Sequence, residues 1–299
     1  MSGLLSNPIA LALIPAVLWG LTPIFDKRGM AAGGGSVQAS LVVVVVEVAI
    51  YWTAIAALRG GSAFSGLTPE ILAVFVGAGV VGTALGRIVI FVGVDRVGAS
   101  LNNAVLSTRP LFATIVALVA LGEPVGPLTI AGIVVLVGGL ATLTISKGGD
   151  LQGWDPRDLA WPLAAAATFG FANVARRYGL LESPITALEA VALNETAGMI
   201  ALTAYVVAAR GRANVLARPR ETYAYFASSG LLTTVAMLSL MAALGLESGR
   251  VALVDPLVAT APLFTVIFAA GLLREFERVT RGVVAGAALI VVGAALITL

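Results

Sequence analysis

The fold is decided by residues 98–145, which read GASLNNAVLSTRPLFATIVALVALGEPVGPLTIAGIVVLVGGLATLTI. This stretch holds two apolar runs separated by a short segment around Glu123. Each run has about 20 residues, the length that an α-helix needs to cross the hydrocarbon core of a bilayer. The runs are apolar on every face, whereas the strands of a membrane barrel alternate in polarity. The stretch therefore predicts two consecutive membrane-spanning helices.

Apolar runs of similar length fill the remainder of the chain. Together with the first two they lie near 8–25, 39–58, 70–94, 98–121 and 127–146, and then near 159–178, 185–209, 222–246, 250–273 and 279–299. The polar segment SKGGDLQGWDPRD, residues 146–158, separates the two sets of five. The sequence therefore predicts an all-α membrane protein with ten transmembrane helices, divided into domains at residues 1–149 and 150–299.

The two halves share an internal repeat. The matching residues are Trp19-Gly20 with Phe169-Gly170, Lys27 and Gly29 with Arg177 and Gly179, Pro110-Leu111-Phe112 with Pro262-Leu263-Phe264, Glu123 with Glu275, and Gly132 and Gly139 with Gly286 and Gly293. The offset rises from 150 to 152 and then to 154 residues, as a duplication with short insertions would produce. Because each half has an odd number of predicted spans, the second must enter the bilayer inverted. Many secondary transporters are built from inverted repeats, with the binding site at the repeat interface near the bilayer midplane.

The composition agrees with a membrane protein and argues against several other functions. Of the 299 residues, 59% are hydrophobic and 11% are charged, whereas soluble domains have roughly a quarter charged residues. Because the chain has no His and no Cys, we expect no Cys or His zinc site, no Cys nucleophile and no cofactor. The net charge of +2 comes from scattered basic residues, so no nucleic-acid partner is expected. The chain has no Walker motif, which argues against ATP-driven transport.

The doubled pattern of residues 98–145 and 249–299 resembles the repeat of the EamA-like branch of the drug/metabolite transporter superfamily. The shared features are a Pro followed by an apolar helix, a Glu near the end of that helix, a Gly-rich closing helix, and the Trp19-Gly20 pair of the first span. The resemblance covers nearly the whole chain. It implies a ten-helix secondary transporter or exporter of small metabolites with a central cavity, which we expect in the inner (plasma) membrane. It does not imply a particular substrate.

Five charged residues within the predicted spans are the main candidates for a transport site. They are Glu47, Arg87, Arg109, Glu195 and Asp255. A charge in the bilayer costs a few kcal/mol even on lenient scales, so these side chains are expected to face a cavity or one another. In the functional interpretation, Arg109 and Arg87 bind an anionic group, while a carboxylate takes up a proton or pairs with an Arg between transport steps. In the structural interpretation, fixed Arg-carboxylate bridges only hold helices together.

Polar residues are expected on the cavity wall beside these charges. In the fourth span Asn102, Asn103 and Arg109 follow near-helical spacing and therefore share one side. Trp19 is expected there because an indole N–H in mid-span needs a partner. Asn173 occupies the corresponding region of the second half. These residues and the five charged ones form the predicted substrate-binding set.

Three prolines predict interruptions in the fourth and ninth spans. Pro110 leaves the carbonyl of Leu106 without its helical donor and can kink the helix. Pro262 does the same to Val258, and Pro256 is expected to add a second break. Such breaks can expose backbone acceptors to a cavity and so serve binding or gating, or they can be packing devices.

Glycines seven residues apart in the fifth and tenth spans allow close helix contact. These are Gly132 with Gly139 and Gly286 with Gly293. The contact can be internal, between the two spans, or it can join two copies of the chain. We therefore expect a monomer or a homodimer.

Lys and Arg residues are distributed unevenly between the two ends of the predicted bundle. Four are assigned to the end that carries the termini, namely Arg59, Arg176, Arg177 and Arg250, and twelve to the opposite end. The positive-inside rule therefore places both termini outside. The family resemblance favours termini inside, so the two arguments conflict.

Together these patterns predict a secondary transporter that moves small polar metabolites, such as amino acids or other carboxylated compounds, by alternating access. Export is favoured by the resemblance alone, and proton coupling is a hypothesis. The alternative is a channel or facilitative pore for small solutes. An intramembrane enzyme is less favoured, because the carboxylates are scattered without an obvious catalytic pair. The expected partners are a small-molecule substrate and the lipid bilayer.

Overall fold

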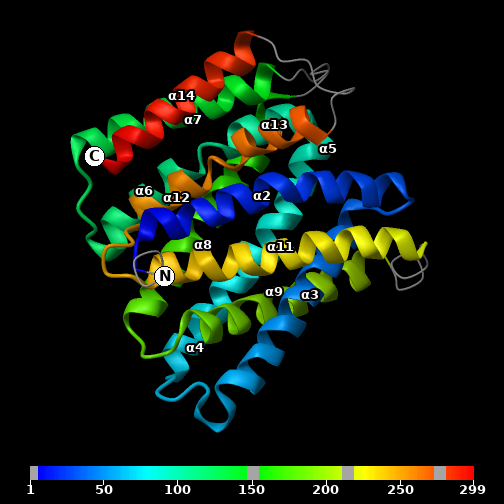
Figure 1. The fold of residues 1–299 in the computed structure, drawn as a ribbon, viewed down its shortest axis with the longest axis vertical. Helices are drawn as coiled ribbons and strands as arrows, with labels where there is room; N and C mark the ends of the chain where they lie inside the picture. The colour runs from blue at the N-terminus through cyan, green and yellow to red at the C-terminus, as the bar shows by residue number, and fades with distance from the viewer. Residues whose placement is uncertain (1–5, 147–154, 211–218, 273–280) are drawn as a thin grey trace.

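The computed structural model describes residues 6–146, 155–210, 219–272 and 281–299. They form helices joined by short loops, and this part of the chain contains no strand (Figure 1), which confirms the all-α prediction. The first half comprises α2 (Pro8–Ala31), α3 (Ser36–Leu58), η1 (Gly60–Ser62), α4 (Pro69–Ala78), the π-helix η2 (Gly79–Leu85), α5 (Gly86–Leu106), α6 (Arg109–Leu121) and α7 (Pro127–Ser146). The second half comprises η3 (Pro156–Leu159), α8 (Ala160–Leu181), α9 (Ala187–Arg210), α11 (Arg220–Gly245), α12 (Val251–Val258), α13 (Ala261–Leu272) and α14 (Arg281–Thr298).

Among the described residues, nine helical segments are long and apolar enough to cross a membrane. Helix α8 is not one of these nine, although it is 22 residues long and packs against α5 and α6. It carries Arg176 and Arg177, which lower its hydropathy. Helix α7 has the bounds that the sequence predicted, whereas α2 extends to Ala31, beyond the predicted end at residue 25.

The predicted boundary between the third and fourth spans lies inside α5. In a straight helix Gly93 and Asn102 would lie roughly 13 Å apart. Instead, the Asn102 side chain lies directly against Gly93. The chain therefore reverses its direction within α5, even though helical hydrogen bonding continues through it.

The fourth and ninth predicted spans are each interrupted immediately before the Pro-Leu-Phe sequence. Both interruptions have the same hydrogen bonds, shifted by 152 residues. They are Thr108 N to Val105 O (3.0 Å) and Leu111 N to Thr108 O (2.9 Å) in the first half, and Thr260 N to Leu257 O (3.1 Å) and Leu263 N to Thr260 O (2.9 Å) in the second. The breaks predicted from Pro110 and Pro262 are therefore confirmed, and their likeness supports the internal repeat.

The additional break expected at Pro256 is absent, because α12 continues through this residue to Val258. Proline removes only one helical hydrogen bond, and membrane helices tolerate it where neighbouring groups satisfy the freed backbone. Pro256 is buried in the packed interior. The prediction at this position was wrong because it considered the helix without its neighbours.

The two glycine-rich helices, α7 and α14, pack along their whole length at the top of Figure 1. A methyl group added to Gly132 would lie 2.8 Å from the carbonyl oxygen of Gly293, and one added to Gly139 would lie 2.9 Å from that of Gly286. The first glycine of one helix thus faces the last of the other, which makes the pair antiparallel. The glycine spacing therefore serves an internal contact between the fifth and tenth predicted spans.

The opening helix of each half packs on the fourth span of the other half. Gly20 of α2 lies against Phe264 of α13, and Gly170 of α8 lies against Phe112 of α6. These four residues are repeat equivalents in exchanged pairs. Helix α2 also lies beside α11 across the middle of Figure 1. The interior is therefore built jointly by both halves.

Candidate functional site

A cavity of about 570 Å³ lies among helices of both halves. It is lined by Trp19, Pro23, Asp26, Ser40, Glu47, Gly82, Thr83, Arg87, Ile90, Asn103, Leu106, Arg109, Phe169, Asn173, Arg176, Glu195, Thr233, Met237, Leu240 and Val258. Two adjoining lobes, of about 300 and 370 Å³, share part of this lining. The equivalent aromatic residues Trp19 and Phe169 both lie on the wall.

Most of the residues that the sequence singled out come together at this cavity. Trp19, Glu47, Arg87, Asn103, Arg109, Asn173 and Glu195 line it. Asp255 lies behind the wall and is fully buried, and Pro262 lines the 370 Å³ lobe. Pro110 and Pro256 are buried in their helices.

Asn102 is the exception, because it is fully buried against Gly93 and does not line the cavity or its lobes. Its side-chain oxygen and nitrogen have no hydrogen-bond partner among the described residues. The prediction that Asn102 and Arg109 share one helix face was wrong, because the helix is interrupted between these residues. The interruption at Ser107 and Thr108 leaves Asn103 on the cavity in place of its neighbour.

An ion pair joins the two halves at the cavity wall. Arg109, at the start of α6, donates from Nε to Asp255 Oδ2 at 3.1 Å. Asn173 of α8 donates its side-chain amide to the other oxygen of the same carboxylate. Asp255 is fully buried and Arg109 is 19% exposed, so the pair partly offsets the cost of removing both charges from water. In this state of the molecule Arg109 is therefore already matched by an anion.

A second polar network surrounds Arg176, which lies one helical turn after Asn173. Arg176 donates from Nη1 to Asn173 Oδ1 at 2.8 Å and from Nε to Asn194 Oδ1 at 3.1 Å. Asn194 in turn donates to Glu195 Oε1 at 2.7 Å, and Thr83 Oγ1 donates to the same oxygen at 3.1 Å. The sequence count placed Arg176 and Arg177 in a loop; both are 4% exposed inside α8, so that assignment was wrong.

Two carboxylates at the cavity have oxygens without donors. Both side-chain oxygens of Glu47 and Oε2 of Glu195 are buried and have no hydrogen-bond partner in the described structure. Each residue is 1% exposed, and both line the cavity from the packed helices α3 and α9. Burying a carboxylate oxygen without a hydrogen-bond donor is costly, so these oxygens are candidate contacts for a donor group of a ligand.

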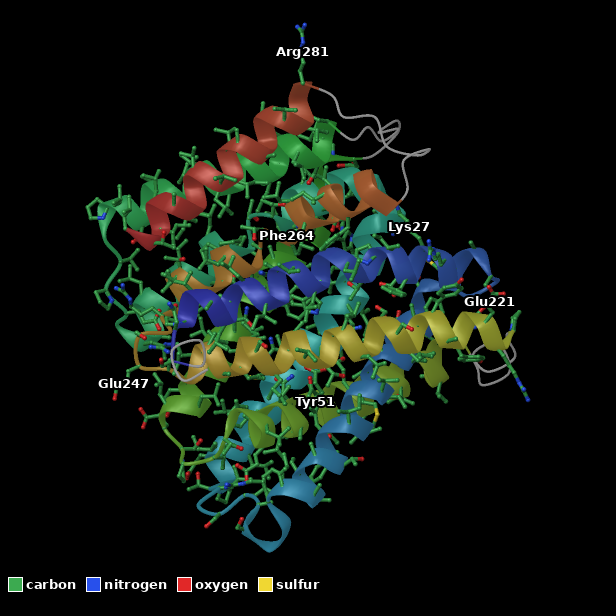
Figure 2. The ribbon with its side chains drawn as sticks, in the orientation of Figure 1. Lys27, Tyr51, Glu221, Glu247, Phe264 and Arg281 are labelled. Carbon is green, nitrogen blue, oxygen red and sulfur yellow. The ribbon has the colours of Figure 1, made fainter. Side chains whose placement is uncertain are left out.

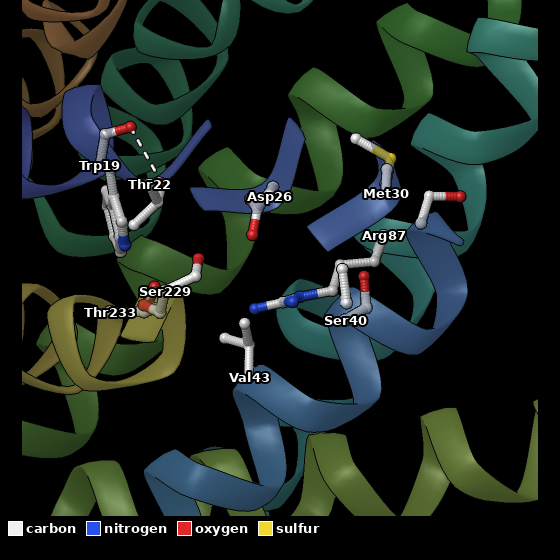
Figure 3. Close-up of a pocket in the computed structure, with 11 residues that line it drawn as sticks. Trp19, Thr22, Asp26, Met30, Ser40, Val43, Arg87, Ser229 and Thr233 are labelled. Atoms are coloured by element: carbon white, nitrogen blue, oxygen red, sulfur yellow. Dashed lines mark hydrogen bonds between the residues drawn. The ribbon is translucent and has the colours of Figure 1, made fainter. Parts of the chain in front are cut away.

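The 300 Å³ lobe brings the cavity to the end of the molecule opposite the termini. It is lined by Met30 and Ser36, which flank the α2–α3 loop, and Met30 is 40% exposed. Figure 3 shows Arg87 extending across this lobe toward α11, with Asp26 of α2 on the facing wall. Lys27, at the same end in Figure 2, lines the 370 Å³ lobe.

The opposite end of the cavity is closed by a packed floor. Beyond Leu240 the interior is filled by side chains that are at most 1% exposed, namely Tyr51, Met241, Leu244, Val251 and Val254. Below them Arg177 pairs with Glu123 and donates to the carbonyl oxygens of Leu244 (2.8 Å), Leu246 (2.9 Å) and Glu247 (3.0 Å). Glu123 also accepts from the amide of Val251 at 2.8 Å. Glu247 marks this end in Figure 2.

Asp26, Thr83 and Arg176 line the cavity but were not among the predicted site residues. Asp26 and Arg176 occupy equivalent positions of the repeat, at the offset of 150 residues. Both lie near the expected ends of their spans, where a charge is ordinarily attributed to a loop. The internal repeat could have indicated these two residues, because both equivalent positions hold a charged side chain.

Comparison with known proteins places the chain in a family. Residues 6–145 and 158–299 each match the EamA-like transporter family. The chain belongs to this family. Its EamA-like repeats and apolar helices make it a multi-pass membrane protein, as the sequence resemblance indicated. No curated protein matches the chain.

The EamA-like chain also shares its fold with solved structures. One of them, titled "Crystal structure of protein", covers 98% of this chain and 99% of its own length with a TM-score of 0.80 and 17% sequence identity. At this identity the likeness concerns the fold alone. The positions of the cavity residues of this EamA-like protein therefore have to be argued from its own geometry.

Proposed function

We propose that this EamA-like protein is a secondary transporter that moves small polar metabolites by alternating access. The observation that carries the proposal is a charged cavity between the two repeats, open at one end of the molecule and filled by apolar side chains at the other. A carrier needs such one-sided access, whereas an open pore needs a continuous path. A channel remains the second candidate, which the flux experiment below separates from the carrier.

We propose further that the protein has ten spans in two inverted repeats, with α8 as the tenth. Helix α8 has 22 residues and packs among the other spans, and its two arginines bond to protein groups and need not face lipid. The antiparallel packing of the equivalent helices α7 and α14 supports the inversion. On this arrangement α6 and α12, which pack against each other, meet at the pseudo-symmetry axis beside the cavity.

Amino acids and other small carboxylated compounds are the substrates that we favour, because the wall combines guanidinium groups with carboxylate oxygens that have no donor among the described residues. Proteoliposomes should take up at least one of labelled L-leucine, L-phenylalanine and L-serine in a saturable manner. Preloading with the same unlabelled amino acid should raise the initial rate several-fold, since a carrier returns faster when loaded. A linear rate that preloading does not change would identify a pore. Export is the proposed direction in cells, measured as net efflux after loading.

Glu47 and Glu195 are the proposed proton carriers, because their unpartnered oxygens are buried at the cavity. Replacing Glu47 with Gln should remove the dependence of transport on pH, since the amide cannot titrate. The same is expected of Glu195→Gln. The measurement is the initial uptake rate at a series of external pH values in proteoliposomes. If both variants keep the pH profile of the parent protein, these carboxylates do not carry the proton.

For orientation we propose that the cavity opens toward the cytoplasm in this state. With Arg176 and Arg177 buried, the basic loop residues at the termini end are reduced to Arg59 and Arg250. The excess of Lys and Arg lies at the other end, which the positive-inside rule places in the cytoplasm. Labelling of introduced cysteines from each face of the membrane tests this orientation directly.

A further inference from the structure

Arg176 is a buried cation that no carboxylate neutralises by direct contact. Its two hydrogen bonds to described residues run to the amide oxygens of Asn173 and Asn194. The ion pairs formed between described residues involve Arg59, Arg96, Arg109 and Arg177, not Arg176. Asn173 also donates to Asp255, and Asn194 also donates to Glu195. Each amide therefore stands between Arg176 and a carboxylate.

The guanidinium groups of Arg109 and Arg177 differ from that of Arg176 in this respect. Arg109 is paired with Asp255 at 3.1 Å. Arg177 is paired with Glu123 and uses its remaining donors on backbone carbonyls. Both are therefore matched within the protein. Of these three groups, Arg176 alone has no carboxylate in direct contact, and it keeps three of its five N–H donors for another partner. Arg87 is half-buried and lines the cavity and the 300 Å³ lobe at its open end.

Arg176 has unused N–H donors at the cavity wall. Its Nη2 atom makes no hydrogen bond to the described residues, and Arg176 lines the cavity together with Gly82. A Cβ atom at Gly82 would lie 3.0 Å from Nη2. The glycine in the π-helix η2 thus keeps this face of the guanidinium uncovered. The two asparagines fix the plane of the group without cancelling its charge.

We propose that Arg176 is the residue that binds the carboxylate of the transported compound, while the Arg109–Asp255 pair holds the two repeats together. This assignment rests on the proposed function and gives its anion-binding role to a residue that the sequence placed in a loop. A guanidinium binds a carboxylate through two parallel N–H donors. Nη2 and the unused donor of Nη1 are available to form that pair.

The test is ligand-induced stabilisation of the purified full-length protein, since binding to the native state raises its apparent melting temperature. The probes are L-leucine, L-phenylalanine and L-serine, each beside its C-terminal amide, which keeps the ammonium group and removes the carboxylate charge. The parent protein should bind at least one acid more tightly than its amide. Arg176→Gln should weaken binding of that acid by about 10- to 100-fold, the value of charged hydrogen bonds, and remove the preference over the amide.

A second variant keeps the test valid if Arg176→Gln does not fold. Asn194→Asp retains Arg176 and nearly the same volume, and it supplies a carboxylate to the guanidinium, so it should weaken acid binding to a similar extent. Asn7→Asp is the matched control, because Asn7 is an exposed N-cap of α2 where Asp caps equally well. This variant should bind the acid as tightly as the parent protein does.

Parent-like acid binding by folded Arg176→Gln or by Asn194→Asp overturns the inference alone. If the parent protein binds none of the acids, the proposed function fails with it.

Discussion

Replacing Arg177 with Ala is expected to lower the free energy of unfolding by about 3–5 kcal/mol, the usual cost of breaking a buried ion pair by removing one partner. The side chains of Arg177 and Glu123 are 5% and 6% exposed. Without the guanidinium, the Glu123 carboxylate would remain as a buried charge, and its one other hydrogen bond from a described residue comes from the amide of Val251. The carbonyls at the end of α11 would lose their donors as well.

The measurement for Arg177→Ala is the apparent melting temperature of the purified protein in detergent, together with its denaturation midpoint. Arg250→Ala is the matched control at the same end of the molecule. Arg250 is exposed, and among the described residues its side chain makes a single hydrogen bond, to the carbonyl oxygen of Pro124 at 3.0 Å. Arg250→Ala should lower the free energy of unfolding by less than about 1 kcal/mol. Equal effects of the two substitutions would show that the Arg177 network does not hold the floor of the cavity together.

Replacing Gly139 with Ala is expected to lower the free energy of unfolding by about 1–3 kcal/mol, because the added methyl group overpacks the α7–α14 contact. A methyl group at this position would lie 2.7 Å from the backbone nitrogen of Ile290 and 2.9 Å from the carbonyl oxygen of Gly286. Both atoms belong to a helix backbone and cannot turn aside as a flexible side chain could. The two helices would therefore have to move apart along their whole seam.

The neighbouring glycine provides a control for the same substitution on the same helix. A methyl group on Gly138 would meet no atom within 4 Å. Because Ala is favoured over Gly in a helix interior, Gly138→Ala should leave the stability unchanged or raise it by up to about 1 kcal/mol. Melting temperatures of the two variants give the comparison. A Gly139→Ala protein as stable as Gly138→Ala would mean that the close antiparallel seam does not form.

The bilayer made much of this arrangement predictable from the sequence. Glu47, Glu195 and Arg109 had to find an interior environment because lipid offers no partner to a charge, and all three line the cavity. The breaks before Pro110 and Pro262 followed from the hydrogen bond that proline removes. Helix α7 could be bounded to the residue, since Pro127 opens it and the polar segment from Ser146 closes it.

The remaining features depended on contacts that a single helix does not reveal. Arg176 lies near the end of a span, where hydropathy cannot separate a buried charge from a loop charge; its partners Asn173 and Asn194 come from two different helices. Asn102 was predicted on the same face as Arg109, but the helix is interrupted between the two residues, so they do not share a face. The sequence could not predict which end of the cavity is open, because the two repeats are nearly equivalent. Glu275, the equivalent of Glu123, lies outside the described residues.

The central claim is that a water-accessible cavity lies between the repeats, open at one end and closed at the other. The chain contains no Cys, so each single Cys introduced into it is the only target of a thiol reagent. Ser40→Cys and Thr233→Cys report on the cavity wall. Ser65→Cys reports on the exposed loop at the closed end, and Val134→Cys, at a position 56% exposed on α7, reports on the lipid-facing surface.

The deciding measurement is the rate at which a membrane-impermeant maleimide labels these variants in intact cells and in inside-out vesicles. The account predicts that Ser40→Cys and Thr233→Cys react from the face opposite to that at which Ser65→Cys reacts, and at least about ten times faster than Val134→Cys. The reactive face for the cavity positions should be the cytoplasmic one. Cavity cysteines that react as slowly as Val134→Cys from both faces, or equally fast from both, would contradict the account.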